Sequence, residues 1–487
     1  MKPVNCPHCG ARLDEGGADA CPACGRPLPV PARWKTALAT VALLAALVGL
    51  AALAWLNRPS DTPLCFTAES DGAAVGLTSR GRVSGVALEI STDGRSWKEW
   101  KTPRRVELPR KGDKLYVRAT SRNPSFGAPN FNAFHDGHND SLHFVIDGQV
   151  AASGDATTLL DHRGKGPSLK GTEYPLAGLF ADCAGLTAAP ELPATELVPG
   201  CYARMFKGCT SLRAAPKLPA TALAAGCYAG MFAGCTALAA APELPAPVLA
   251  PGCYREMFKD CSALATAPEL PANAVAESSY SQMFAGCTSL TAAPELPANA
   301  VAESSYSRMF AGCTSLTTAP RLPANAVADS SYLQMFAGCT SLTAAPELPA
   351  TQLAKLCYWE MFKGCTALRT SPSRLPASEL PEFCYQGMFG DCAALQAAPE
   401  IAAVKLGRGC CSRMFMGCAN LQTAPARLPA TELAADCYGW MFRGCVKLTA
   451  APELPATKLA RACYAEMFRG CAVLTAAPKL PATELAP

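Results

Sequence analysis

From residue 179 onward, apolar residues recur in one fixed pattern. The repeated motif is Cys-Tyr-x-x-Met-Phe-x-Gly-Cys, followed by Thr-Ser-Leu and then by Ala-Pro-Glu-Leu-Pro-Ala. Twelve copies follow one another at a step of 26 residues, or 27 in two places, and the first is a degenerate copy at Leu179-Phe180. The phenylalanines of the other eleven copies are Phe206, Phe232, Phe258, Phe284, Phe310, Phe336, Phe362, Phe389, Phe415, Phe442 and Phe468. A fixed step of this length predicts a solenoid, in which each unit buries its apolar face against its neighbours.

The segment from Cys201 to Cys209 shows what one unit is expected to form. On a helix of 3.6 residues per turn, its Cys, Tyr, Met and Phe side chains fall within an arc of roughly 140°. This spacing predicts an amphipathic helix of two turns, which Gly208 is well placed to end. A short strand from Leu212 and a turn bounded by prolines complete the unit. We therefore predict an α/β fold, a strand/helix solenoid of about twelve repeats over residues 153–487.

Twenty-one of the 26 cysteines belong to the repeats. The second cysteine of the motif is present in every unit, whereas the first is replaced in three units by Ser279, Ser305 and Ser331. Helical positions eight residues apart lie about 12 Å apart, too far for a disulfide within one unit. We therefore predict buried, unpaired cysteines that pack as small apolar residues. Cross-links between neighbouring units remain the alternative.

Four more cysteines form two Cys-x-x-Cys-Gly pairs within residues 1–30: Cys6, Cys9, Cys21 and Cys24. Each pair is typical of a tight turn that directs two sulfur atoms to one point, with glycine allowing the backbone to twist. Two such turns supply the tetrahedral four-thiolate shell of a structural zinc site, which leaves no open position for catalysis. A redox dithiol is the weaker alternative, because no thioredoxin-like pattern surrounds the motif. The segment resembles a bacterial zinc ribbon.

Residues 36–56 carry no charge and are rich in Ala, Leu and Val. At 1.5 Å per residue they reach about 30 Å, which predicts one transmembrane helix. Basic residues are more frequent before the span than after it, so the zinc ribbon is expected in the cytoplasm of a bacterium. The remaining domains are then expected in the periplasm or outside the cell, as parts of a single-pass membrane protein. A cleavable signal peptide is the weaker alternative, because the preceding metal motif is unlike a signal n-region.

Residues 62–152 show alternating apolar and polar runs instead of helical periodicity. Strands are predicted at 86–90, 114–118 and 143–146, and Asp93-Gly94 is a strong hairpin dipeptide. We expect a small β-sandwich here. The formal net charge of the whole chain, +4, is too small to indicate a nucleic-acid partner.

The repeat motif resembles the 26-residue repeat of bacterial surface proteins related to BspA-like leucine-rich repeats. The clearest match is Met-Phe-x-Gly-Cys-Thr-Ser-Leu-Thr-x-Ala-Pro-Glu-Leu-Pro-Ala, and the segment 148–161 resembles the lead-in of such proteins. The resemblance implies a leucine-rich-repeat-like solenoid displayed at a cell surface. Adhesion or protein binding is the role that it implies.

An extended array favours binding over catalysis, and four large side chains stand at variable motif positions where solvent is expected: Leu333, Trp359, Met416 and Trp440. Such residues are plausible anchors for a protein or envelope ligand, although packing against neighbouring units is an equal alternative. A transmembrane sensor that reports through the zinc ribbon and a passive envelope scaffold are the alternative functions. The five histidines show no nucleophile–base arrangement, so we do not expect an enzyme.

Overall fold

The structure is a computed structural model that describes residues 4–6, 9–13, 21, 23–26, 62–80, 86–101, 105–123, 141–161, 168–171 and 174–482. The chain divides into two compact units, Met1–Arg58 and Pro59–Pro487. In the first unit, β1 (Val4–Asn5) pairs antiparallel with β2 (Arg12–Leu13).

The predicted membrane span, residues 36–56, lies outside the described residues. Within the described part of the chain, we find no helix of sufficient length and hydrophobicity to cross a bilayer. The single-pass membrane localisation expected from the sequence is corrected accordingly. The sensor alternative depended on that span, and the described residues do not support it.

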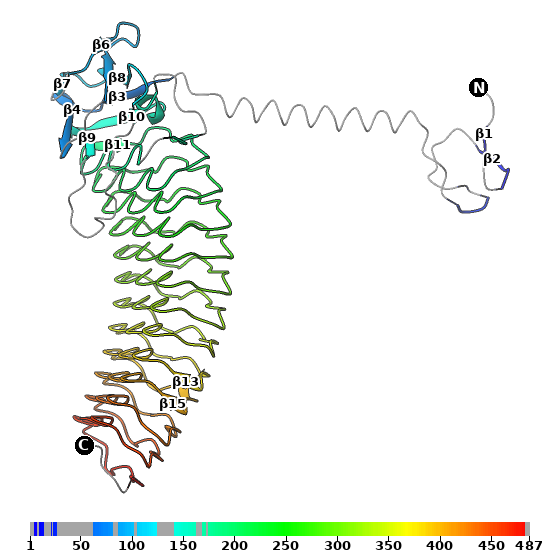
Figure 1. The fold of residues 1–487 in the computed structure, drawn as a ribbon, viewed down its shortest axis with the longest axis vertical. Coiled ribbons are helices and arrows are strands. Elements are labelled where there is room, and N and C mark those ends of the chain that lie inside the picture. The colour runs from blue at the N-terminus through cyan, green and yellow to red at the C-terminus, as the bar shows by residue number, and fades with distance from the viewer. Residues whose placement is uncertain are drawn as a thin grey trace. The chain divides into compact units, whose positions relative to one another are not determined.

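The described parts of residues 62–153 form two sheets that face each other (Figure 1). Most of the larger sheet comes from β3 (Leu64–Ala68), β5 (Leu88–Ser91), β6 (Lys98–Glu99), β8 (Lys114–Ala119) and β10 (Val150–Ser153), in the order β10-β3-β8-β5-β6. The smaller sheet has the order β7-β4-β9, from β7 (Arg105–Leu108), β4 (Ala73–Arg80) and β9 (Ser141–Asp147). Phe66 on β3 meets Phe144 on β9 with ring centroids 4.8 Å apart, so the core lies between the sheets. The predicted strands are confirmed, with β5, β8 and β9 at the expected places.

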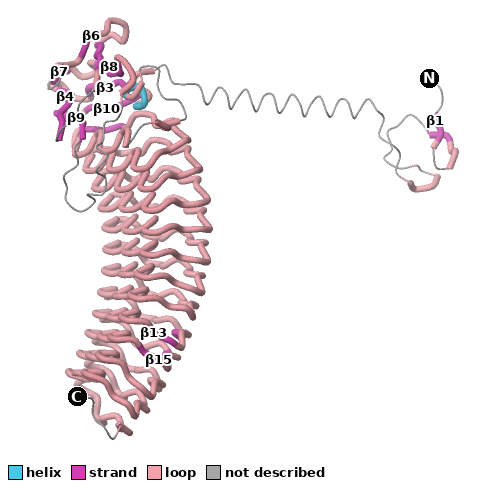
Figure 2. The backbone as a smooth tube through the Cα atoms, viewed as in Figure 1, coloured by secondary structure: helices cyan, strands magenta, loops and turns pink. Residues whose placement is uncertain are grey.

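The repeats form coils that stack one upon another, as the fixed step predicts (Figure 1). Successive coils are joined by single parallel bridges one repeat apart, such as Ala214 to Ala240 and Ala240 to Thr266. Regular strands are few in the coils, as Figure 2 shows. They are β11 (Leu186–Ala188), β12 (Arg374–Leu375), β13 (Glu379–Leu380), β14 (Glu400–Ile401) and β15 (Lys405–Leu406).

The helix predicted for each unit is wrong. Within the described residues the only helix is a short 3₁₀ turn, η1 (Ala156–Leu159). In the segment 198–209, every second amide closes a tight turn, as Cys201 N does by donating to Val198 O at 3.2 Å. The amides between them donate to the next coil, as Tyr202 N does to Cys227 O at 2.9 Å. We call this segment of each coil the turn ribbon.

The turn ribbon has a left-handed residue at every fourth position. Gly200, Arg204 and Gly208 have φ of 62°, 55° and 74°, and each is the third residue of a turn, as type II turns require. A helix cannot contain such residues at every turn, because only glycine adopts this conformation freely. The motif's apolar period of four therefore belongs to a chain of turns, although it is close to the 3.6 of a helix.

The aromatic residues of the motif stack into two columns inside the coils. Neighbouring phenylalanine rings from Phe180 to Phe468 lie 5.4–5.7 Å apart and within 9° of parallel. The tyrosine column runs from Tyr202 to Tyr464 with spacings of 5.5–6.0 Å and one interruption, at Cys411. No ring can bury both faces within its own coil, so the stack stabilises each coil only through its neighbours.

The two-sheet segment contacts the first coil as a preceding coil would. Strand β10 pairs in parallel with β11 of the first repeat, and Phe144 stacks on Phe180 at 5.2 Å. Cys183 Sγ donates to Phe144 O at 3.1 Å, just as Cys209 Sγ donates to Phe180 O. Residues 62–161 therefore cap one end of the array, which would otherwise expose an apolar surface.

Candidate metal centre and interaction faces

The four N-terminal cysteines converge on one point in the first unit. Their Sγ atoms all lie within 4.8 Å of one another, with Cys6 to Cys24 at 3.9 Å and Cys9 to Cys21 at 3.7 Å. Four thiolates around one zinc ion at about 2.3 Å would place their sulfur atoms about 3.8 Å apart. The cluster is thus positioned to hold a metal ion of this size.

Two matching turns build the cluster. Gly10 N donates to Cys6 O at 2.9 Å, and Gly25 N donates to Cys21 O at 2.8 Å. Both glycines have positive φ, 77° and 66°, which explains why glycine follows each pair. The β1–β2 pairing brings the first turn back on itself, since Cys6 N also donates to Ala11 O at 2.8 Å. These backbone hydrogen bonds direct the four sulfur atoms toward one point.

The predicted anchor residues lie on the turn ribbons, on one face of the coils. Leu333 and Trp359 occupy the same motif position in successive coils, and Met416 and Trp440 lie two and three coils further along. All four are half-buried, so each presents part of an apolar side chain to solvent and packs with the rest. The guanidinium of Arg413 lies 5.2 Å from the centre of the Trp440 ring, a cation–π contact between coils.

Polar side chains flank these anchors and link the coils. Gln334 bridges Arg308, at 2.6 Å, and Glu360, at 2.7 Å, and Lys363 donates to Glu360 at 2.7 Å. The ribbon face is therefore a band of linked polar groups in which a few large apolar side chains stand. That combination is common in protein interfaces, where aromatic anchors sit within a polar rim.

The repeat cysteines are buried, as predicted, and they are free thiols. The second cysteine of each coil also has a role that the sequence did not indicate, because its thiol donates to the phenylalanine carbonyl of the preceding coil. Cys235 donates to Phe206 O and Cys313 donates to Phe284 O, at 3.0 and 3.1 Å. Burial raises the pKa of both thiols to about 12. They are therefore protonated donors in the core and poor nucleophiles.

Asp155, at the junction between the cap and the coils, was also missed by the sequence analysis. It is fully buried, and it accepts a hydrogen bond from Thr157 N at 2.7 Å as the N-cap of η1. Burial raises the pKa of its carboxyl to about 6, against the opposing effect of the bond from Thr157. Its burial comes from segments distant in sequence, since Asp155 pairs with Pro63 and Glu191, and no local pattern indicates it.

Among the histidines, His143 lies buried on β9, and the other four lie outside the described residues. The sequence prediction of a protein without catalysis stays a prediction.

Comparisons with known proteins add one partial similarity. No family model matches the chain, and no curated protein matches it. A solved structure of a leucine-rich repeat protein from Bacteroides ovatus is 18% identical and has a TM-score of 0.28; the match covers 51% of this chain and 74% of that one. A likeness at this level does not identify a family.

Proposed function

We propose that this chain is a repeat scaffold that binds a protein partner through its turn-ribbon face. The observation that supports the proposal is the set of four large apolar side chains on that face, which stay partly exposed: Leu333, Trp359, Met416 and Trp440. The equivalent positions of other coils hold small or polar residues, such as Ala203, Ser281 and Ser307. Because packing of the coils does not need the large residues, their exposed parts are best explained by an external contact.

Site-specific photo-crosslinking tests this function. A photoreactive phenylalanine analogue at Leu333 or Met416 should trap one and the same protein in cells that make the full chain. Trp359→Ala and Trp440→Ala should each reduce that product, since a central aromatic anchor commonly contributes about 2 kcal/mol or more to binding. The same probe at Thr317, which is exposed outside the turn ribbon, is the matched control. Equal products from Thr317 and Leu333, or no loss in the tryptophan variants, would refute the proposal.

We also propose that the N-terminal cluster holds a structural zinc ion, with Cys6, Cys9, Cys21 and Cys24 as its four ligands. The sulfur spacings of 3.7 and 3.9 Å support a tetrahedral thiolate shell. Four protein ligands leave no position for a substrate, so the ion would stabilise the fold of residues 4–26 and would not act in catalysis. Zinc analysis of the purified chain tests this: about one ion per chain is expected, and its absence after purification with zinc present would refute it.

A further inference from the structure

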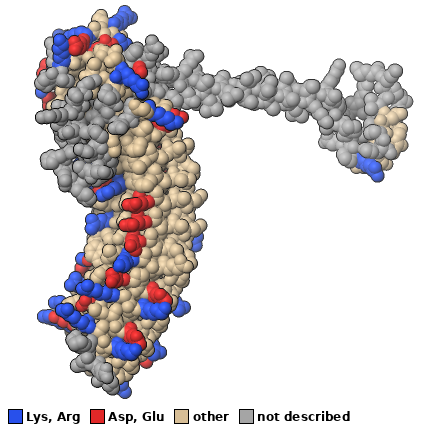
Figure 3. All heavy atoms as spheres, viewed as in Figure 1, with Lys and Arg blue, Asp and Glu red and all other residues tan. Residues whose placement is uncertain are grey.

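One edge of the coils carries a single column of charged residues. It is formed by the residue at the Glu position of the Ala-Pro-Glu-Leu-Pro motif, and every member is exposed to solvent. In chain order the column is Glu191, Lys217, Glu243, Glu269, Glu295, Arg321, Glu347, Arg374, Glu400, Arg427, Glu453 and Lys479. Figure 3 shows charged side chains that follow one another along the stack of coils. We call this column and its flanking prolines the charged edge.

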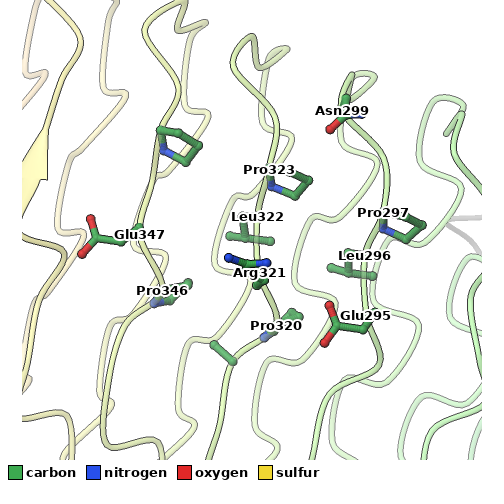
Figure 4. A pocket seen from close by; sticks show the side chains of 12 residues that line it. Glu295, Leu296, Pro297, Asn299, Pro320, Arg321, Leu322, Pro323, Pro346 and Glu347 are labelled. Carbon is green, nitrogen blue, oxygen red and sulfur yellow. The ribbon is translucent and has the colours of Figure 1, made fainter.

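The column alternates in sign over most of its length, yet its members form few contacts with one another. Among the described residues, Arg427 and Glu453 are the one ion pair within the column, at 3.7 Å. Figure 4 shows Arg321 between Glu295 and Glu347 on three successive coils, and no ion pair joins Arg321 to either glutamate in this described region. Glu347 accepts hydrogen bonds from Ser373 N at 3.1 Å and Ser373 Oγ at 3.2 Å, which leave its charge unneutralised. The three charges are therefore available to an external partner.

A shallow groove lies at the middle of the charged edge. Its volume is about 730 Å³, and it spans the three coils that carry Glu295, Arg321 and Glu347. Its walls are largely apolar, with Leu296, Leu322 and exposed proline rings such as Pro323 (Figure 4). Proline has no amide to donate, so the groove can be covered without leaving many unsatisfied backbone donors.

We propose that the charged edge is a self-association surface, on which a second copy of this chain binds in antiparallel orientation. With a two-fold axis between the coils of Arg321 and Glu347, Arg321 of each copy faces Glu347 of the other copy. Counted outward from that axis, the facing pairs are Arg321 with Glu347, Glu295 with Arg374, Glu269 with Glu400, Glu243 with Arg427, Lys217 with Glu453, and Glu191 with Lys479. Five of these six pairs are opposite in charge.

The alternatives are disfavoured by the same column. Parallel association in register would place each charged residue opposite the same residue of the second copy, and therefore opposite a like charge. An antiparallel axis that passed through Arg321 itself would pair like charges at five of six positions, for example Glu295 with Glu347. Like charges in contact oppose parallel association and axes that pass through a coil, so the column favours antiparallel association about an axis between two coils. Of these axes, the one between Arg321 and Glu347 pairs all twelve coils.

The size of the edge suits a stable dimer. Eleven steps of about 4.8 Å separate the twelve coils, so the edge is about 50 Å long. The five residues from one proline to the alanine after the next add a width of about 16 Å. An area of about 800 Å² per copy results, the size typical of specific protein interfaces.

Charge reversal tests this proposal in the full chain, with sedimentation velocity at low salt as the readout. Arg321→Glu repels Glu347 twice in the dimer and should weaken association about tenfold. The double variant Arg321→Glu/Glu347→Arg should restore it. Glu269→Lys should tighten association, because it replaces the one repulsive pair by an attractive one. This gain cannot arise from misfolding.

Glu303→Lys is the matched control, since Glu303 is an exposed glutamate outside the column and forms no ion pair among the described residues. It should leave association unchanged, and added salt should weaken the wild-type dimer. A chain that stays monomeric at all concentrations would overturn the proposal and would favour a foreign basic segment as the occupant. A dimer that responds equally to Glu303→Lys and Arg321→Glu would overturn it as well.

Discussion

The interruption of the tyrosine column at Cys411 gives the sharpest test of how the coils are stabilised. Ten of the eleven full motifs have an aromatic ring at this position, and Cys411 replaces it between Tyr385 and Tyr438. The backbone does not close the gap. Tyr385 N donates to Cys410 O at 2.8 Å and Cys411 N donates to Cys437 O at 2.9 Å, the usual spacing between coils. Tyr385 instead tilts 25° from Tyr358, whereas the other neighbouring pairs differ by 3–16°.

We expect Cys411→Phe to stabilise this part of the stack. A ring at position 411 would gain two stacking contacts of about 0.5–1.5 kcal/mol each, besides its own burial. Strain from a larger side chain in the core costs about 1–3 kcal/mol when no space exists. Because Tyr385 tilts beside the gap while the backbone keeps its usual spacing, we expect room for a ring and a net gain of about 1 kcal/mol. Cys411→Tyr should gain less, since the hydroxyl of the neighbouring Tyr438 is buried without a hydrogen-bond partner.

Hydrogen exchange of the amides in residues 384–442 measures the effect locally, which matters because a long array does not unfold in one step. Exchange through local opening should slow about fivefold in Cys411→Phe, corresponding to about 1 kcal/mol. Cys411→Ser, which adds no ring, serves as the control and should not slow exchange. Faster exchange in Cys411→Phe would show that the gap is already filled and would refute the reasoning.

Three further predictions concern titration, thiol chemistry and metal removal. Asp155 has a pKa of about 6 when folded and about 3.9 when unfolded, so the folded state binds more protons between these values; stability should fall as pH rises from about 4 to 6. Asp155→Asn should remove this pH dependence in urea titrations and raise stability at pH 7 by on the order of 2 kcal/mol; an unchanged pH profile would contradict the assignment. The repeat thiols, Cys235 and Cys313 among them, should resist alkylation at pH 8 in the native chain and react on denaturation, as mass spectrometry can show, whereas rapid native labelling would contradict their burial. Cys24→Ser should release the proposed zinc ion, measured by metal analysis, and should leave the stability of residues 62–482 unchanged; equal zinc content in both chains would contradict the ligand assignment.

The sequence allowed the stacked coils to be predicted because the motif recurs at a step of 26 or 27 residues even where individual motif residues differ between units. It also allowed the strands of the cap and the convergence of the four N-terminal cysteines to be predicted. The turn ribbon could not be recognised from apolar spacing alone, since a period of four and a period of 3.6 differ little over nine residues. One unit did contain the signal: Gly226, Gly230 and Gly234 are four residues apart, and all three have positive φ. In other units a polar residue such as Arg204 or Glu256 occupies the left-handed position, so the sequence there lacks the glycine that would indicate the turn.

The thiol contacts and the burial of Asp155 depend on which chain segments become neighbours after folding. Cys235 and Phe206 are 29 residues apart, and no local pattern links a cysteine to a distant carbonyl. The tilt of Tyr385 likewise follows from the side chain absent in the next coil.

The direction of the hydrogen bonds between turn ribbons has a mechanical consequence. Bonds such as Phe206 N to Met231 O run along the stack axis, so a pull on the two ends of the array loads them lengthwise, one coil boundary at a time. Each coil that peels away would release a chain of 26 residues, about 85–95 Å at full extension. Under tension the array would therefore lengthen in equal steps, as an extensible tether that yields coil by coil and does not rupture at once.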